Sequence, residues 1–212
     1  MKTHARYIHA FGPAILTRFY DPMMRILREE KFKGRLIELA RIQPGQRILD
    51  VGCGTGTLAL LIQQRHPDTD VHGIDGDPKI LEIARDKAAR ARATIAFECA
   101  MAWELPYPDA TFDLVVSSLV FHHLATDDKR RAAGEILRVL RPSGTLLLAD
   151  FGPPSNMVGK AIASIVRRFE EVADHVTERL PRILTDAGFS DVAEIDRFET
   201  HIVPITYLRG CK

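Results

Sequence analysis

The sequence predicts an α/β fold built on a doubly wound, mostly parallel sheet with helices on both faces. Three observations support this prediction. Short apolar stretches alternate with amphipathic ones through the middle of the 212-residue chain, a glycine-rich turn follows the first apolar stretch, and two strand-like stretches lie almost back to back near the end. We therefore expect seven strands, of which the last two form an antiparallel pair, with extra helices at the N-terminus.

The middle of the chain supplies the alternation of strands and helices. Residues 47–51 form a brief, mostly apolar stretch that is followed at once by glycines, which favours a buried strand. Pro78 stands in the first turn of an expected helix, where a missing N–H costs little. A later helix carries Ala132 and Ile136 on one apolar stripe and ends before Pro142. In order, the expected elements are a strand over 47–51, a helix over 57–65, a strand over 71–74, a helix over 78–90, strands over 94–99 and 112–117, a helix over 127–140 and a strand over 145–149.

The two ends of the chain depart from this alternation. The first forty residues are typical of helices interrupted near Gly12-Pro13 and Asp21-Pro22. Two strands with so short a connection suit an antiparallel pair, because a parallel pair needs a crossover of about a dozen residues or more. The apolar stripe of the 158–173 helix either packs against the sheet or lids an apolar pocket. After residue 152 we expect helices over 158–173 and 176–187 and strands over 191–198 and 201–208.

Composition excludes several classes of protein. A net charge of only +1 argues against a dedicated nucleic-acid binder, and no run of about 18 apolar residues exists to span a membrane. The three cysteines are far apart and odd in number, which favours a reducing, cytoplasmic setting over a disulfide framework or a zinc site. The first residues lack the pattern of a signal peptide.

Charge is uneven along the chain. Residues 1–47 hold ten Lys and Arg against four acids. This excess is either a solvated helix face or a platform for an acidic substrate or an anionic membrane surface, which leaves peripheral membrane contact open.

A glycine-rich turn after the first strand is the strongest local signal. The glycines follow the spacing Gly52-x-Gly54-x-Gly56, whereas a dinucleotide-binding turn is written G-x-G-x-x-G/A and would place a small residue at Thr57. Asp50 lies at the end of the strand, where a pyrophosphate arriving at the helix N-terminus would meet its negative charge. A zwitterionic amino-acid tail tolerates that acid better, so a nicotinamide-dependent oxidoreductase is the weaker alternative.

The stretch Asp50-Val-Gly-Cys-Gly-Thr-Gly56 resembles the class I S-adenosylmethionine-dependent methyltransferases, and the likeness runs from about residue 45 to 152. The whole chain is nearest to their ubiquinone/menaquinone-biosynthesis-like group. The resemblance implies one Rossmann-like domain over 1–212: N-terminal helices over 1–44 that cap the active site, a cofactor-binding core over 45–152, and a lid-like helix, last helix and strands over 153–212. It implies S-adenosylmethionine as cofactor and S-adenosylhomocysteine as product.

The same resemblance implies where the cofactor binds. The backbone around Gly52, Cys53, Gly54 and Gly56 would hold the methionine part, with Asp50 orienting either the loop or the amino group. Asp75, followed by Gly76, ends the next strand, and its carboxylate can accept hydrogen bonds from both ribose hydroxyls. Asp77 is expected to cap the following helix.

The adenine side departs from the family pattern. Alignment on Leu105-Pro106 puts Met101 where related sequences often carry an aspartate that binds the adenine amino group. Adenine would then depend on backbone groups at Ala102 and Trp103 and on apolar contact.

The segment after the fourth strand carries the catalytic candidates. Ser117 is expected to offer its carbonyl to the cofactor ammonium. His122 and His123 are adjacent, so they cannot both face the pocket, and we expect His123 to do so. In some relatives that methylate amines, a histidine of this segment pairs with an N-terminal tyrosine, and the best matches here are His123 and Tyr20; the alternative is a histidine that caps the loop.

The predicted reaction is methyl transfer to a small acceptor by in-line displacement, performed mainly through positioning in a dry pocket. The resembling group is diverse in substrate, so quinone precursors, amines, phospholipid head groups and other small metabolites are all candidate acceptors, and an apolar, acidic or lipid-like acceptor is among the possibilities. No metal site is expected, because Pro78 and the helix after Asp75 and Asp77 exclude a calcium loop. The sequence leaves open a second alternative, in which the protein binds the cofactor but catalyses no methyl transfer.

Overall fold

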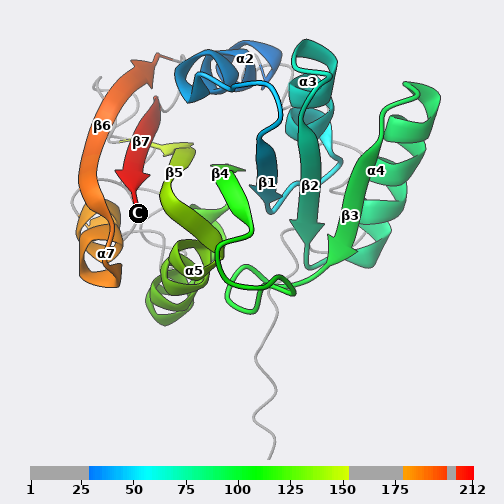
Figure 1. Ribbon diagram of the computed structural model, residues 1–212. Helices are drawn as coiled ribbons and strands as arrows, with labels where there is room; N and C mark the ends of the chain where they lie inside the picture. Colours follow the sequence, from blue (N-terminus) through cyan, green and yellow to red (C-terminus); the bar gives the residue numbers. More distant parts are fainter. Residues whose placement is uncertain (1–28, 153–178, 200–203) are drawn as a thin grey trace, which may run out of the picture.

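The computed structural model describes residues 29–152, 179–199 and 204–212. Its elements alternate as predicted before the antiparallel end (Figure 1). They are α2 (Glu29–Ala40), β1 (Arg47–Val51), α3 (Thr57–Arg65), β2 (Asp70–Asp75), α4 (Pro78–Arg90), β3 (Ile95–Cys99), β4 (Phe112–Ser118), η1 (Phe121–His123), α5 (Thr126–Val139), β5 (Leu140–Phe151), α7 (Arg179–Ala187), β6 (Ser190–Phe198) and β7 (Ile205–Cys211). The helices predicted over 158–173 and in the first 28 residues, including Tyr20, lie outside the described residues.

The described strands form one seven-stranded sheet in the order β3-β2-β1-β4-β5-β7-β6. β1 lies at its centre and is parallel to both β2 and β4, and the next strands outward, β3 and β5, are parallel as well. β7 runs antiparallel between β5 and β6. The predicted mostly parallel sheet with an antiparallel C-terminal pair is confirmed, and the strand order reverses between β1 and β4, where sheets of this kind bind ligands.

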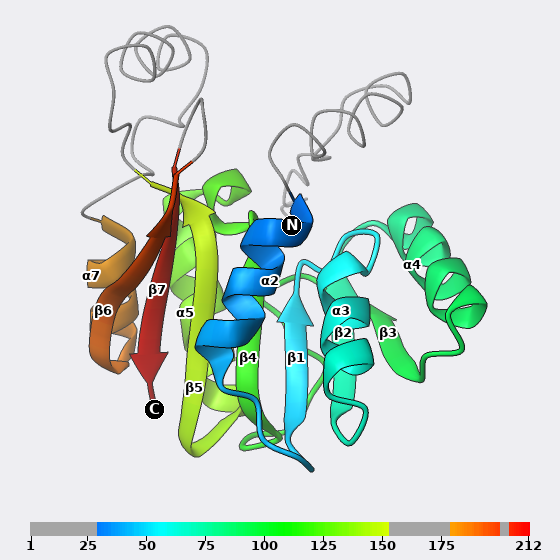
Figure 2. The same cartoon turned by 90° about the horizontal axis from the view of Figure 1, so that it is seen from above.

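Helices cover both faces of the sheet (Figure 2). α2, α3 and α4 lie on one face and α5 and α7 on the other. Successive β1 residues contribute to opposite cores: Ile48 packs with Phe32 and Leu36 of α2, whereas Leu49 packs with Ile136 of α5. Burial of both faces explains why apolar residues follow one another in these strands, as Ile48-Leu49 in β1 and Leu114-Val115-Val116 in β4.

β5 and β7 differ most from their predicted bounds, and the early start of β5 also shortens α5. α5 ends at Val139 rather than at residue 140, because Leu140 already pairs with Phe112 at the start of β5. Pro142 falls within a register shift before pairing resumes between Leu114 and Thr145, which is how the strand accommodates a proline. β7 runs on to Cys211 instead of ending at 208, since its pairing with β5 continues across Arg209.

Candidate functional site

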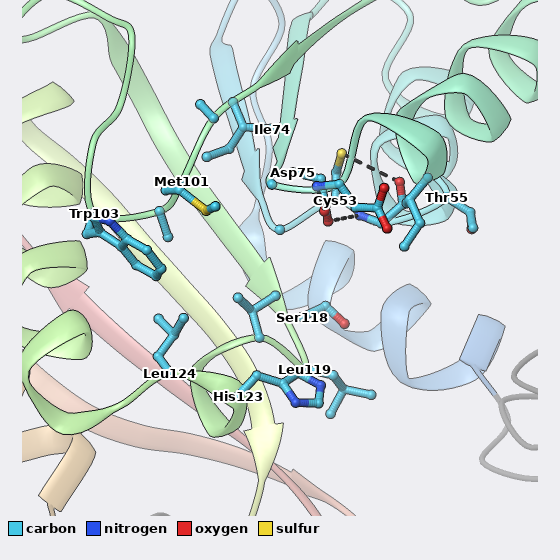
Figure 3. A pocket seen from close by; sticks show the side chains of 18 of the residues that line it. Cys53, Thr55, Ile74, Asp75, Met101, Trp103, Ser118, Leu119, His123 and Leu124 are labelled. Carbon is cyan, nitrogen blue, oxygen red and sulfur yellow. Dashed lines mark hydrogen bonds between the residues drawn. The ribbon is translucent and has the colours of Figure 1, made fainter. Parts of the chain in front are cut away.

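A cavity of about 230 Å³ opens at the carboxyl ends of β1, β2 and β4 (Figure 3). The turns that follow these strands and β3 supply most of its wall. Figure 3 shows Met101 and Trp103 on the left and Asp75 and Thr55 on the right, with His123 between them and below. The wall therefore combines an apolar side, an acidic side and a histidine.

The glycine turn after β1 brings backbone to the cavity wall. Gly52 has a φ of 70° and Gly54 one of 54°, values that side-chain-bearing residues rarely adopt. A Cβ on Gly52 would lie 2.4 Å from Val120 Cγ2, so this glycine lets the turn after β4 come close. A Cβ on Gly54 would meet nothing within 4 Å, and Gly54 lines the cavity, so here the space is left for a ligand. Gly56 does not line the cavity and packs against Ala84 and Phe97.

Asp75 joins the glycine turn to β2. Its Oδ2 accepts a hydrogen bond from the Gly54 N–H at 2.9 Å, and its Oδ1 accepts from the Asp77 N–H at 2.9 Å. Burial raises the pKa of this carboxyl. Each carboxylate oxygen has a second lone pair, so Asp75 can still accept from a diol at the cavity. Asp77 accepts from the Lys79 N–H at 2.9 Å and is the predicted helix cap.

Asp50 lies beneath the cavity and does not line it. Only 1% of the residue is exposed, and within the described residues its Oδ2 has no hydrogen-bond partner. Burial raises the pKa of Asp50 to about 7, against the lowering effects of the Lys33 charge and of a hydrogen bond from the Ala59 amide in α3. This bond to the first turn of α3 favours a role in orienting the turn. Cys53 does line the cavity, but burial raises the pKa of its thiol, as suits a residue with no nucleophilic role.

Sequence reasoning missed a cation at the cavity. Lys33 and Glu29 of α2 both line it, and the Lys33 Nζ lies 2.6 Å from Glu29 Oε1. Lys33 is only 8% exposed, and its charge acts on Asp50. A glutamate and a lysine four residues apart are typical of a solvated helix face, so the pattern alone carries no signal of burial. Lys33 is the cation in this wall that can hold an anionic group such as a carboxylate.

The predicted adenine-side residues all line the cavity. Met101, Ala102 and Trp103 follow β3, with Gly76 beside them after β2. Ile74 and Ile80 add further apolar surface. The result is a slot with a mostly apolar wall, as expected for a planar heterocycle.

The last residue of β4, Ser118, lines the cavity, whereas Ser117 does not. Ser117 is buried, and its hydroxyl donates to the Val51 carbonyl at 2.8 Å, which ties β4 to β1. The cavity is lined instead by Ser118, Leu119 and Val120. Among the described residues the buried Ser118 hydroxyl has no hydrogen-bond partner, which suits a group that awaits a ligand.

The two histidines of η1 separate as predicted. His123 lines the cavity, and burial together with the nearby charge of His122 lowers its pKa to about 4. His122 turns to Asp150 at the end of β5: its Nδ1 lies 2.7 Å from Asp150 Oδ1, and its backbone N–H donates to Oδ2. The two imidazole rings lie 3.9 Å apart between centroids, so the Asp150–His122 pair also fixes the His123 ring.

Comparisons with known proteins agree with this geometry. A family model described as a methyltransferase domain matches residues 48–144. An O-methyltransferase of Pyrenophora dematioidea is 35% identical over 187 residues, which cover 84% of this chain and 67% of that protein. The chain belongs to the S-adenosylmethionine-dependent methyltransferases.

Other members of this methyltransferase family are similar over shorter lengths or in fold. A demethylmenaquinone methyltransferase of Thermus thermophilus is 39% identical over 138 residues, covering 64% of this chain and 62% of that protein. The chain thus spans less than two thirds of this relative's length. A solved S-adenosylmethionine-dependent methyltransferase of Aquifex aeolicus superposes with a TM-score of 0.72 at 19% identity, over 95% of this chain and 98% of that one.

Within this methyltransferase fold, most of the predicted site residues meet at one cavity. Nine of them line the cavity, whereas three others do not: Asp50, Gly56 and Ser117. Tyr20 lies outside the described residues. In the described parts of the chain no cluster of three or more metal-ligating side chains occurs, and no helix there is long and apolar enough to cross a bilayer.

Proposed function

We propose that the cavity binds S-adenosylmethionine and that the chain transfers its methyl group to a small-molecule acceptor. The observation that carries this proposal is the meeting of three features at one cavity: the open backbone at Gly54, the carboxylate of Asp75 and the apolar slot at Met101 and Trp103. Each feature matches one part of the cofactor, and the chain's family supports the match.

The residues divide the cofactor among them. Gly54 leaves room for the methionine tail, and the ammonium of Lys33 can hold its carboxylate. Asp75 accepts from the ribose hydroxyls, and the slot from Met101 to Trp103 takes the adenine. Bound in this way, the cofactor supplies an electrophilic methyl group on a sulfonium sulfur for in-line attack by the acceptor.

His123 is the residue we assign to the acceptor. With a pKa of about 4 its imidazole is neutral near pH 7 and accepts a hydrogen bond from an acceptor O–H or N–H. Leu119 and Leu124 lie beside it at the cavity, which favours an acceptor with an apolar body. Relatives carry names of quinone, rifamycin and phosphoethanolamine methyltransferases, so quinols, phenols and amines form the natural panel.

Binding and turnover need separate tests, because a solved [4+2]-cyclase has the same fold, with a TM-score of 0.70. Calorimetry with S-adenosylmethionine, S-adenosylhomocysteine and a nicotinamide dinucleotide tests the cofactor. We expect binding of the first two alone, and binding of the dinucleotide alone would overturn the assignment. Methyl incorporation measured by mass spectrometry across the panel then tests transfer, with His123→Ala as the variant expected to lose it. Tight cofactor binding with no transfer to any acceptor class would contradict the proposed activity.

A further inference from the structure

The loop that carries Met101 and Trp103 has neither helix nor strand of its own. It connects β3 to β4, and Ala102 and Leu105 are buried within it. Close to Met101 it is held by a bond from the Ala100 N–H to the Asp75 carbonyl and by a turn between Glu104 and Met101. Further along, its backbone is held by side chains of α5, thirty or more residues away in sequence.

Arg138 of α5 makes most of these contacts. Its Nη1 donates to the Tyr107 carbonyl at 2.8 Å and to Asp109 Oδ1 at 2.8 Å, and its Nη2 donates to the Leu105 carbonyl at 3.1 Å. The same guanidinium bonds Glu135 through Nε at 2.8 Å and Nη2 at 2.9 Å. One side chain therefore joins two loop carbonyls and two carboxylates.

Glu135 completes the arrangement. Its Oε2 accepts a hydrogen bond from the Leu105 N–H at 2.8 Å, so both backbone groups of Leu105 are bonded to the Glu135–Arg138 pair. The loop cannot shift along α5 without breaking several charge-assisted bonds together.

The pair belongs to a polar stripe that reaches the cavity. Residues 128, 131, 135 and 138 are spaced by three, four and three, so they share one face of α5. The Arg131 guanidinium lies 5.9 Å from the centre of the Trp103 ring, and Asp128, which pairs with Arg131, lines the cavity. The stripe therefore runs from the base of the loop to the wall that Trp103 forms.

We propose that Arg138 and Glu135 are positioning residues that set the affinity for the adenosine half of the cofactor by holding the loop from Met101 to Tyr107 in its binding shape. This inference rests on the proposed function. Preorganisation is the physical basis: a loop already ordered does not have to be ordered during binding, so the affinity stays high. Neither residue lines the cavity, so the effect passes through the loop backbone and Trp103.

Arg138→Lys is the sharpest perturbation. A lysine keeps the charge, but its compact ammonium cannot replace a planar fork that serves four acceptor groups at once. The matched control is Arg130→Lys on the same helix, where Arg130 makes a surface ion pair with Asp127 and its side chain is 61% exposed. Both changes keep net charge and helix propensity nearly constant.

Calorimetry with S-adenosylhomocysteine is the test. We expect Arg138→Lys to weaken binding by about tenfold, comparable to loss of one or more charge-assisted bonds, while Arg130→Lys binds as the unchanged protein does. In the Trp103→Ala background the Arg138→Lys effect should shrink, because the two residues act through one loop. With an active acceptor, the KM for S-adenosylmethionine should rise while kcat at saturation is retained.

Several results would overturn the inference. Equal affinity of Arg138→Lys and Arg130→Lys, with the unchanged protein binding normally, would remove the positioning role but leave the proposed function intact. Fully additive effects of Arg138→Lys and Trp103→Ala would show that Arg138 does not act through this loop. No binding by the unchanged protein would overturn the proposed function and this inference together. If Arg138→Lys fails to fold, Glu135→Gln replaces it, since the amide oxygen still accepts from the Leu105 N–H but no longer pairs with a cation. Unchanged affinity of Glu135→Gln for S-adenosylhomocysteine would equally overturn the positioning role.

Discussion

Replacing Gly54 by alanine separates ligand space from backbone strain. Gly54 and Gly45 both have positive φ, 54° and 79°, and a Cβ on either would meet nothing within 4 Å. Gly54 lines the cavity, whereas Gly45 lies in the turn before β1, outside the cavity wall. Gly45→Ala is therefore a control with the same backbone penalty and no added atom in the cavity.

The expected magnitudes follow from this difference. An alanine in the left-handed region costs about 1–2 kcal/mol in either variant. In a domain of this size each kcal/mol lowers Tm by about 2–4 °C, so both variants should remain folded. Only Gly54→Ala places a methyl group where the cofactor tail would approach, and overpacking of that kind costs about 1–3 kcal/mol. This corresponds to about 5- to 150-fold weaker binding.

Calorimetry with S-adenosylhomocysteine and a thermal melt of both variants provide the assay. We expect similar Tm losses and a weakened affinity in Gly54→Ala alone. Equal affinities of the two variants would refute the assignment of the open space at Gly54 to the cofactor. A collapse of Tm in Gly54→Ala alone would refute the reasoning that its Cβ meets no protein atom.

Four further substitutions test the carboxylates and the adenine slot. Asp75→Ala should weaken the binding of S-adenosylmethionine and S-adenosylhomocysteine alike by about 1.5–3 kcal/mol. Asp77→Ala should instead lower the free energy of unfolding by about 1 kcal/mol, because a helix cap is lost, and leave the affinity measured by calorimetry unchanged. The reverse pattern would exchange the roles of the two residues. Met101→Asp should tighten cofactor binding by about 1.5–3 kcal/mol if it restores an acceptor for the adenine amino group, and weaker binding by a folded variant would show that Met101 itself packs on adenine. Burial raises the pKa of Asp50 to about 7, so the stability that this group contributes is complete below its ordinary pKa of 3.8 and is lost as pH rises through 7. The Tm should therefore fall more steeply from pH 5 to pH 8 in the unchanged protein than in Asp50→Asn. Parallel profiles of Tm against pH would contradict the raised pKa.

The local features of this protein could be read from its sequence. The glycine turn, the cap at Asp77 and the bounds of α3 and α4 depend on backbone conformation and apolar period within a few residues, and the structure has them as predicted. The end of β2 at Asp75 likewise follows from a short apolar run. The antiparallel end of the sheet followed from a connection too short for a crossover.

Other features required the strands to be placed side by side. Leu140 joins β5 because Phe112 of the neighbouring strand pairs with it, which no helical period reveals. Ser118 lines the cavity and Ser117 does not, because side chains alternate along a strand and neighbouring residues point to opposite sides.

Charged residues were the hardest to assign from sequence. Lys33 and Arg138 both stand in patterns that suit a solvated helix face, yet one lies at the cavity beside Asp50 and the other holds the backbone at Leu105. Their roles depend on partners 17 and 33 residues away in the chain. Hydrophobic period determines which face of a helix is buried, but the packing of helices on the sheet decides which charges at the edge of that face meet a partner, and only the tertiary structure contains that information.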